Sequence, residues 1–341
     1  MPMNDTLLKA CRLEVTDHIP VWIMRQAGRY LPEYRKLREG HTLMQLFEDP
    51  HVCSEVMSMP VDRFGFDAAV LFADIMLPLR SLDFEFTLVD NLGPMVERPI
   101  RNLAGVFALK RRNVDEAIPY VFDAIRMARK RLDVPIIGFC GGPFTVASYM
   151  IEGRSTREFG KTRMFMKAYQ GGWKALMERL TDMSIEYLQH QIRAGVSVVQ
   201  LFDSWAGYLT PSEYSDHVME YSKRILDALP KEIPKIHFSA RNSHILELLK
   251  SAGGNVIGVD STISIGEAWK RLGYDVGVQG NLDPQLMLGS SFSVRQGAER
   301  ILMQVDSRPG FIFNLSHGIL PDTPVANVAE LVEAVHGYRG E

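Results

Sequence analysis

The sequence predicts an α/β protein built as a single, somewhat distorted (β/α)₈ TIM barrel. Short apolar runs alternate with longer helical patterns, these runs number eight, and no linker or charge block divides the 341 residues. Alternating strands and helices favour parallel pairing, and eight such units favour a sheet that closes on itself. We therefore expect one barrel domain spanning residues 1–341.

Each predicted strand is a run of apolar, often β-branched residues that ends at a polar residue or a glycine. Such runs are typical of strands buried on both faces. A doubly wound open sheet is the alternative, but no GxGxxG motif follows the first run, so a dinucleotide site is not expected. The eight runs cover residues 20–24, 68–74, 135–142, 196–204, 235–240, 256–261, 276–282 and 310–318.

Three further segments have recognisable local patterns. Residues 165–195 carry apolar positions at three- and four-residue spacing and end at Gly195, which predicts a helix with a glycine C-cap. Residues 210–229 open with Thr-Pro-Ser, a helix N-terminal signal. Residues 84–100 alternate and turn near Asn91-Leu92-Gly93-Pro94, which predicts a hairpin inserted after the second strand.

Composition limits the class of protein. The net charge of -3 shows no basic excess of the kind that nucleic-acid binding requires. The N-terminal residues lack an apolar run long enough for a signal peptide or a membrane span. Three widely spaced cysteines, and no CxxC or HExxH motif, fit a reducing compartment without a local zinc site. We expect a cytoplasmic protein with neither nucleic-acid nor membrane partners.

The C-terminal ends of barrel strands are where active sites form in this class of fold. The residues found there are mostly polar and include two arginines, which would suit an anionic ligand. They are Arg25, Arg29, Asp74, Gly141, Gly142, Asp203, Ser204, His237, Ser239, Asp260, Gln279, Asn281 and His317.

Several of these residues also have a structural interpretation. Asp203 and Asp260 are expected to cap a helix or hold a loop, as aspartates after strands often do. His237 and His317 each have apolar neighbours, and a lone histidine there is more often structural than catalytic. Cys140 lies in an apolar strand and is expected to be a small buried hydrophobe. Asp74 has no clear helix start beside it, so a functional role is favoured.

The pair Arg25 and Arg29 is the strongest local signal for a binding site. A guanidinium stays charged in a protein, and its planar fork binds carboxylates or phosphates with two parallel hydrogen bonds. Gly28, between the two arginines, would let a ligand approach the backbone closely. The alternative is that both arginines pair with structural acids such as Glu33.

A longer stretch around these arginines identifies a family resemblance. Residues 20–35, PVWIMRQAGRYLPEYR, resemble the signature of the uroporphyrinogen decarboxylase family. Further family-like blocks follow in order, so the resemblance spans essentially the whole chain. They are LFADI (71–75), GGPFTVASYMIEG (141–153), QLFDSWAG (200–207), QGNLDP (279–284) and FNLSHGILPDTP (313–324).

The resemblance implies a fold and an activity. Members of the family are homodimers of a single distorted (β/α)₈ barrel and use no metal or organic cofactor. They convert the four acetate side chains of uroporphyrinogen III to methyl groups, which gives coproporphyrinogen III for haem biosynthesis. The small-molecule partner implied for this chain is therefore uroporphyrinogen III.

The resemblance also implies roles for particular residues. Arg25 and Arg29 would bind substrate carboxylates, and Asp74 would face the pyrrole NH groups at the centre of the macrocycle. The backbone from Arg25 to Arg29 would add further contacts. The remaining substrate-binding residues implied are Gln26, Ala27, Gly28, Tyr149, Ser204 and His317.

The chemistry of decarboxylation agrees with this arrangement. Loss of CO₂ from an arylacetate leaves an electron pair, which a pyrrole can accept if a ring carbon is first protonated. Asp74 would stabilise the resulting cation. The proton donor is left open among Arg29, which is a weak acid, Tyr149 and His317.

Two other functions are alternatives. A zinc-dependent, corrinoid-linked methyltransferase of similar fold would need a His-x-Cys pair, but the corresponding residues here are His237 and Ser239, and no cysteine follows Cys140. A porphyrin carrier would need only the fold.

One departure from the family pattern is Trp205, where some members carry histidine.

Overall fold

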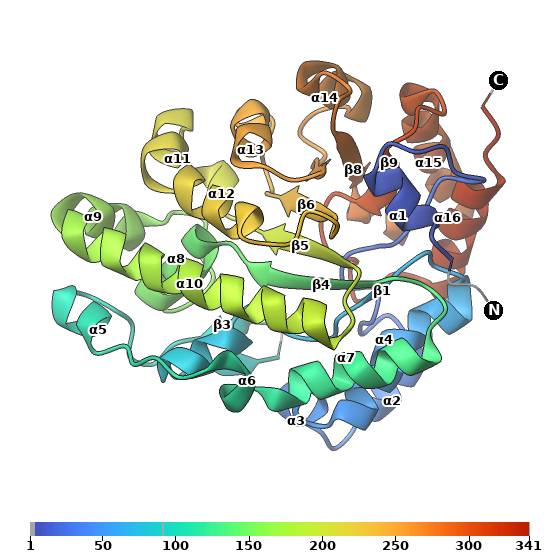
Figure 1. Ribbon diagram of the computed structural model, residues 1–341. Helices are drawn as coiled ribbons and strands as arrows, with labels where there is room; N and C mark the ends of the chain where they lie inside the picture. The colour runs from blue at the N-terminus through green and yellow to red at the C-terminus, as the bar shows by residue number, and fades with distance from the viewer. Residues whose placement is uncertain (1–3, 91, 341) are drawn as a thin grey trace.

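The centre of the molecule is a curled sheet of seven parallel strands in the computed structural model, which describes residues 4–90 and 92–340 (Figure 1). The strand order is β1-β4-β5-β6-β7-β8-β9, and strands β4 to β9 fall inside the third to eighth predicted runs. Their bounds are β1 Ala69–Val70, β4 Ile136–Gly141, β5 Val198–Phe202, β6 Lys235–Phe238, β7 Val256–Gly258, β8 Gly277–Leu282 and β9 Phe311–Leu315.

Helices pack around the outer face of this sheet, as the alternating sequence pattern predicts (Figure 1). Short 3₁₀ helices lie at Leu77–Leu82, Ala206–Tyr208 and Pro284–Leu288. The α-helices are α1 Thr6–Cys11, α2 Pro32–Arg38, α3 Leu43–Glu48, α4 Pro50–Phe64, α5 Leu103–Phe107, α6 Val114–Ala117, α7 Pro119–Arg131, α8 Pro143–Glu152, α9 Gly160–Ala168, α10 Gln170–Ala194, α11 Pro211–His217, α12 Met219–Asp227, α13 Leu246–Ala252, α14 Ile265–Leu272, α15 Ser291–Val305 and α16 Val325–Gly337.

The first predicted strand, residues 20–24, is reduced to one parallel bridge between Val21 and Phe313. The Phe313 N–H donates to the Pro20 carbonyl, and the Trp22 N–H donates to the Phe313 carbonyl. At the other edge of the sheet, the Asp67 N–H donates to the Val21 carbonyl, 3.0 Å away. This segment therefore bonds both to β9 and to the residue two positions before β1.

Side chains explain why this segment forms no longer ladder. The Ile23 N–H donates to Gln26 Oε1 at 3.2 Å, and the Met24 N–H donates to Asn314 Oδ1 at 3.1 Å. Gln26 Nε2 in turn donates to the Ala68 carbonyl at 2.8 Å. Amide side chains therefore satisfy backbone groups that a regular strand would pair with its neighbours.

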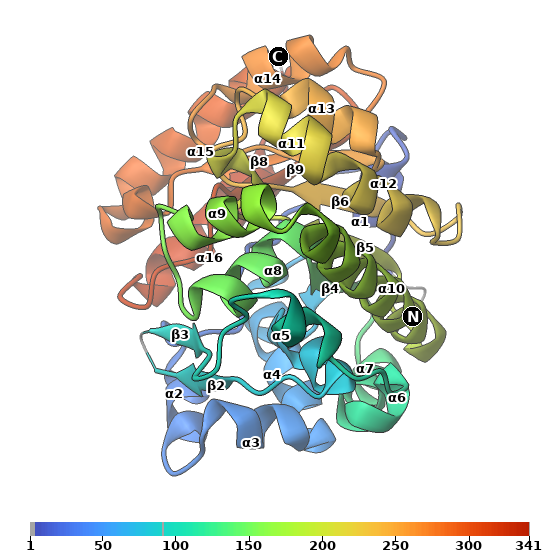
Figure 2. The same cartoon turned by 90° about the vertical axis from the view of Figure 1, so that its left-hand side faces the viewer.

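The predicted hairpin is present as an antiparallel pair, β2 Thr87–Val89 and β3 Gly93–Met95. Asn91, one of the predicted turn residues, lies outside the described residues. Figure 2 shows the pair at the edge of the molecule, apart from the seven-stranded sheet. The chain then returns to α8 through hydrogen bonds from Val96 N–H to the Gly153 carbonyl and from Ile100 N–H to the Met150 carbonyl.

Both long predicted helices are interrupted once. Tyr169 leaves helical geometry between α9 and α10, just before the Gly171-Gly172 pair, whose low helix propensity favours a break there. Val218 separates α11 from α12 because Trp173 Nε1 donates to the His217 carbonyl at 3.2 Å, an acceptor that a continuous helix would use internally. The predicted Gly195 C-cap is confirmed.

Apolar side chains fill both faces of the sheet. On the inner face, Trp22, Ile137, Val198 and their neighbours pack against α1, which covers the N-terminal ends of the strands. In Figure 1, α1 lies on the right, and α8 and α9 lie on the opposite side. Among the described residues, no helix combines the length and apolar character that a membrane span needs.

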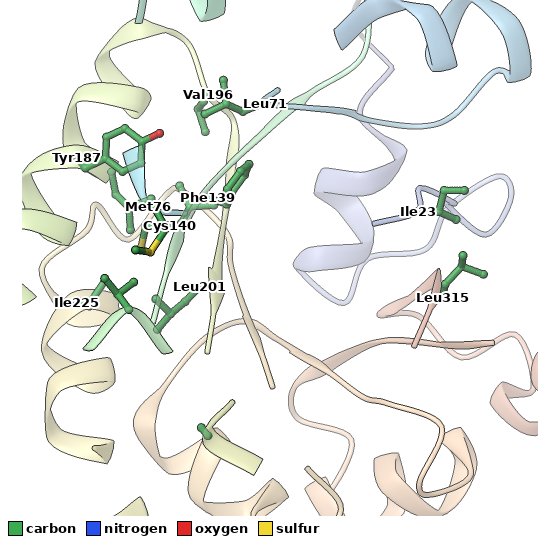
Figure 3. Close-up of a cluster of buried hydrophobic side chains, with 14 of the residues drawn as sticks. Ile23, Leu71, Met76, Phe139, Cys140, Tyr187, Val196, Leu201, Ile225 and Leu315 are labelled. Carbon is green, nitrogen blue, oxygen red and sulfur yellow. The ribbon is translucent and has the colours of Figure 1, made fainter. Parts of the chain in front are cut away.

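Cys140 lies on the outer face of the sheet, where it is a small buried hydrophobe, as predicted. Its thiol lies among Met76, Tyr187, Leu201 and Ile225 in the core between sheet and helices (Figure 3). Cys140 is 1% exposed, and burial raises the pKa of its thiol to about 12. A thiol held protonated in this way packs as a hydrophobe.

The buried carboxylate of Asp67 connects the residues before β1 to segments near both ends of the chain through hydrogen bonds. Asp67 accepts hydrogen bonds from His18 Nε2 and His336 Nε2, each at 2.8 Å, and from the Val21 N–H at 2.8 Å. Burial alone would raise the pKa of Asp67, but the bonds from the two histidines outweigh it and lower the pKa to about 2. The bond to Asp67 raises the pKa of His18.

Replacement of Asp67 by asparagine should destabilise the protein by about 3–5 kcal/mol, because His18 loses its buried counter-charge and the hydrogen bonds from His336 and the Val21 N–H are disturbed. The loss should be largest between about pH 4 and 6.5, where Asp67 is ionised and His18 protonated, since the Asp67 contribution fades on acidification and the His18 contribution on alkalinisation. Urea unfolding at several pH values measures this dependence. The exposed pair Asp62–Arg131 is the control, and Asp62→Asn should cost less than about 1 kcal/mol.

Candidate active site

The segment that carries the two arginines is fixed by its neighbours. Gln26 is 1% exposed, with its side chain bonded into the core, and the Tyr30 hydroxyl donates to the Gln26 carbonyl at 2.8 Å. Arg25 has a positive φ of 64°, and both Arg25 and Arg29 are exposed. The Gln26 N–H also donates to the Ile23 carbonyl at 3.0 Å, so the side chain and backbone of Gln26 hold the segment in place while the two exposed arginines flank it.

The alternative pairing with Glu33 does not occur for Arg25. Glu33 forms its ion pair with Arg63. Among residues 4–90 and 92–340, Arg25 forms no ion pair with a carboxylate. An exposed guanidinium held by a rigid backbone is suited to receive an anionic group from a ligand.

Asp74 follows β1 and is half-buried. Its Oδ1 accepts a hydrogen bond from the Met76 N–H at 2.8 Å, which fixes the carboxyl group at the start of a 3₁₀ helix. Burial raises the pKa of Asp74, while the Met76 bond and the charge of Arg25 act in the opposite direction. One carboxyl group is thus held near a cation in a partly desolvated position.

Tyr149 and His317 lie within reach of the same charges. Burial and the charge of Asp74 raise the pKa of Tyr149 to about 12, with Arg25 opposing the shift. Enclosure and the charge of Arg25 lower the pKa of His317. The charge of Arg25 therefore acts on Asp74, Tyr149 and His317 alike, and the Arg25 side chain lies against Gly318, the residue next to His317.

A hydroxyl bridge fixes the loop that carries Ser204. Thr145 Oγ1 donates to Asp203 Oδ1 at 3.0 Å and accepts the Trp205 N–H at 3.1 Å. The Trp205 ring packs on the Tyr149 ring with centroids 4.1 Å apart and planes 31° apart. Asp203 and Thr145 thus position the half-buried Ser204 and, through Trp205, the aromatic ring of Tyr149.

Asp203 and Asp260 are structural, as predicted. Asp203 is fully buried and accepts the Thr145 and Ser222 hydroxyls, and burial raises its pKa to about 6. Asp260 accepts the Arg241 N–H and both the N–H and the hydroxyl of Thr262. Both carboxylates therefore accept hydrogen bonds within the protein and hold loops in place.

The other strand-end candidates are also used internally. His237 is fully buried, shares a hydrogen bond with the Leu249 carbonyl at 3.3 Å, and has its pKa lowered to about 4 by burial. The Ser239 hydroxyl accepts the Gly207 N–H. The Gln279 amide lies between Trp22 and Gln200 inside the sheet, and Asn281 Nδ2 donates to the carbonyls of Asp260 and Ile263.

Thr145 and the packing of Trp205 on Tyr149 were not expected from the sequence. Thr145 lies 58 residues from Asp203 in the chain, so no local spacing announces their hydrogen bond. The one sequence signal for Thr145 is its position in the block GGPFTVASYMIEG, four residues before Tyr149.

The amino-acid sequence of this chain is similar to those of known proteins. Residues 2–338 match the family model described as uroporphyrinogen decarboxylase (URO-D). The chain is 43% identical over 337 residues to the uroporphyrinogen decarboxylase of Carboxydothermus hydrogenoformans, covering 98% of this chain and 96% of that protein. It is also 43% identical over 334 residues to that of Thermus thermophilus, covering 98% of each chain.

Solved structures show a similar fold at low sequence identity. A methyltransferase from Methanosarcina mazei superposes with a TM-score of 0.83 and 21% identity, covering 98% of both chains. A B12-independent methionine synthase from Shewanella sp. W3-18-1 gives a TM-score of 0.58 at 13% identity, covering 96% of this chain and 98% of that one. At these identities the likeness concerns the fold alone.

Replacement of Thr145 by valine should destabilise the protein by about 1–3 kcal/mol, because it removes a donor from buried Asp203 and an acceptor from the Trp205 N–H. Thr145→Ser should restore most of this stability. Thr181→Val is the matched control, since within the described chain the buried Thr181 hydroxyl has no hydrogen-bond partner. Equal effects of the two valine substitutions on urea unfolding would contradict the proposed bridge.

Proposed function

The chain belongs to the uroporphyrinogen decarboxylase family and is a carboxy-lyase, and we propose in detail how it works on uroporphyrinogen III. The enzyme removes the carboxyl groups of the four acetate side chains, without a cofactor, and releases coproporphyrinogen III. The observation that carries this proposal is the common electrostatic environment of Arg25, Asp74, Tyr149 and His317 at one end of the sheet.

The charges of the site match those of the substrate. Uroporphyrinogen III carries eight carboxylates around its rim and four pyrrole NH donors at its centre. Arg25 and Arg29 would bind rim carboxylates through bidentate hydrogen bonds, with backbone groups of Gln26, Ala27 and Gly28 alongside them. Asp74 would accept hydrogen bonds from the central NH groups. Ser204 would contact a further polar group of the macrocycle.

Each decarboxylation consumes one proton, since an acetate carboxylate and a proton become a methyl group and CO₂. Protonation of the adjacent pyrrole carbon creates a cation that accepts the electron pair of the breaking C–C bond. Protonation of the resulting exocyclic methylene carbon completes the methyl group, and loss of the first proton from the ring carbon restores the neutral pyrrole, so the net consumption is one proton. The Asp74 carboxylate would stabilise the cation, and its hydrogen bond from the Met76 N–H would keep it in the same orientation during the reaction.

Tyr149 and His317 have complementary states near neutral pH. With a pKa of about 12, Tyr149 keeps its proton and donates a hydrogen bond to a substrate oxygen. The pKa of His317 is lowered, so the neutral imidazole can exchange a proton with the macrocycle without adding charge beside Arg25. We assign proton movement to the set of Arg29, Tyr149 and His317.

The finer architecture belongs to the same proposal. The hydrogen bonds that residues 20–22 make at both edges of the sheet support an eight-stranded barrel that this segment closes, with the β2–β3 hairpin inserted. We propose that residues 1–341 form one domain, that the enzyme is a cytoplasmic homodimer, and that it uses no metal.

The function is tested by incubating the protein with uroporphyrinogen III under reducing conditions and separating the products by number of carboxyl groups. The expected product has four carboxyl groups, with seven-, six- and five-carboxyl intermediates appearing before it. Tight binding of an unchanged eight-carboxyl substrate would instead identify a carrier and overturn the proposal.

Asp74→Asn should lower kcat by about 10²–10³-fold, because an amide cannot stabilise the pyrrole cation as a carboxylate does. Asp74→Glu should keep part of the rate, since the charge remains but is displaced. Asp62→Asn, which alters a surface carboxylate, is the control and should leave turnover unchanged. A near-normal rate in Asp74→Asn would exclude the electrostatic role.

Gly318→Ala should lower kcat/KM at least about tenfold by displacing Arg25, because a methyl group at residue 318 would lie 2.5 Å from Arg25 Cδ. Gly337→Ala is the matched control, since its added methyl group meets no heavy atom of the described residues within 4 Å. Steady-state rates of the two variants make the comparison. Equal activity would show that the position of Arg25 is unimportant.

A further inference from the structure

We propose that Arg241 is a further carboxylate-binding residue of this site, located on the side of the sheet opposite Arg25 and Arg29. The inference rests on the proposed function, because it concerns the same polycarboxylate substrate. The two arginines proposed above belong to one short segment, so carboxylates on the far rim of the macrocycle need a further cation. Arg241 supplies a cation there.

The strand order places Arg241 across the sheet from Arg25. Arg241 follows β6, and β6 is the middle strand of the seven, with three strands on either side. The segment of Arg25 bonds instead at the two outer edges of the sheet, to β9 and to Asp67. Since all seven strands are parallel, residues that follow them lie at the same, C-terminal end.

The backbone of Arg241 is held in an unusual conformation. Its φ is 54°, in the left-handed region that residues other than glycine seldom adopt. Its N–H donates to the carboxylate of Asp260, which also binds Thr262 and so ties two strand-end loops together. Such a conformation costs free energy and often marks a functional position.

The side chain of Arg241 is held by an aromatic ring and not by an acid. Its guanidinium carbon lies 5.1 Å from the centre of the Tyr208 ring, within the range of a cation–π interaction. Arg241 is exposed, and no carboxylate of the described residues forms an ion pair with it. By contrast, Arg163 in α9 and Arg224 in α12 pair with Glu213 and Glu178.

A continuous row of aromatic rings connects Arg241 to Tyr149. Tyr208 packs on Phe159 with ring centroids 5.1 Å apart, Phe159 packs on Trp205 at 5.1 Å, and Trp205 packs on Tyr149 at 4.1 Å. The row links the ring that holds the guanidinium to the ring of Tyr149 in the proposed substrate site. A cation fixed in this way and lacking a carboxylate partner is preorganised for an anionic ligand.

The test measures binding of uroporphyrin, the fluorescent oxidised macrocycle with the same eight carboxylates, by fluorescence titration. Arg241→Gln should weaken binding about ten- to a hundredfold, as expected for loss of a charge-assisted hydrogen bond. Arg241→Lys should retain much of the affinity because the charge remains. Coproporphyrin, with four carboxylates, should be affected less than uroporphyrin.

Arg308→Gln is the matched control. Arg308 is also exposed and lies over an aromatic ring, 4.0 Å from the centre of Tyr274, but it precedes β9 at the N-terminal end of the sheet. The Arg308→Gln substitution should therefore leave the affinity for uroporphyrin and the turnover unchanged. Thermal unfolding of each variant shows whether a weakened affinity reflects unfolding.

Three outcomes are decisive. If Arg241→Gln binds uroporphyrin as tightly as Arg308→Gln does, Arg241 does not contact the substrate. If Arg241→Lys loses as much affinity as Arg241→Gln, Arg241 acts through packing on Tyr208 and not through charge, which also overturns the inference. Failure of the wild-type protein to decarboxylate uroporphyrinogen III would refute the proposed decarboxylase function. That result is distinct from the two binding outcomes for the Arg241 variants.

Discussion

The parallel order of the sheet is the constraint on which the site depends. Because every strand runs in the same direction, side chains that are far apart in sequence meet where the strands end. Helix α1 covers the opposite end and fills it with apolar side chains, so the chemistry is confined to one end. The Asp67 carboxylate accepts hydrogen bonds from His18, His336 and the Val21 N–H, and so connects the residues before β1 to segments near both ends of the chain.

Within that end, the charge of Arg25 organises the surrounding titratable groups. Its effect reaches Asp74, Tyr149 and His317, so a substrate carboxylate bound to Arg25 would change the environment of all three. The backbone around Arg25 is correspondingly rigid, since Gln26 is bonded into the core and the Met24 carbonyl accepts the Ile319 N–H at 2.9 Å. In the proposed mechanism, Arg25 therefore links substrate binding to the chemistry.

Much of the fold could be predicted from the sequence because its strands are buried on both faces and read as continuous apolar runs. Strands β4 to β9 follow those runs closely, whereas the segment 20–24 does not form a full strand, since Gln26 and Asn314 satisfy its amides. The interruption of α11 and α12 depends on Trp173, which lies 44 residues from the carbonyl it binds. Contacts between distant residues of this kind leave no local pattern.

The same reason limits prediction of the site. Asp74 and Asp203 both follow apolar runs, yet one is half-buried beside Arg25 and the other is enclosed by Thr145 and Ser222. The family resemblance separated the two, and the hydrogen bonds supply the physical reason. The residues next to Arg241 in sequence give no indication of its contacts with Tyr208 and Asp260.

The measurement that tests this account most directly is a crystal structure of the protein with coproporphyrinogen bound under reducing conditions. We expect the macrocycle at the C-terminal end of the sheet, with its pyrrole NH groups directed at the Asp74 carboxylate and a propionate paired with Arg25. A product bound elsewhere, or one with Asp74 directed away from the pyrrole nitrogens, would contradict it.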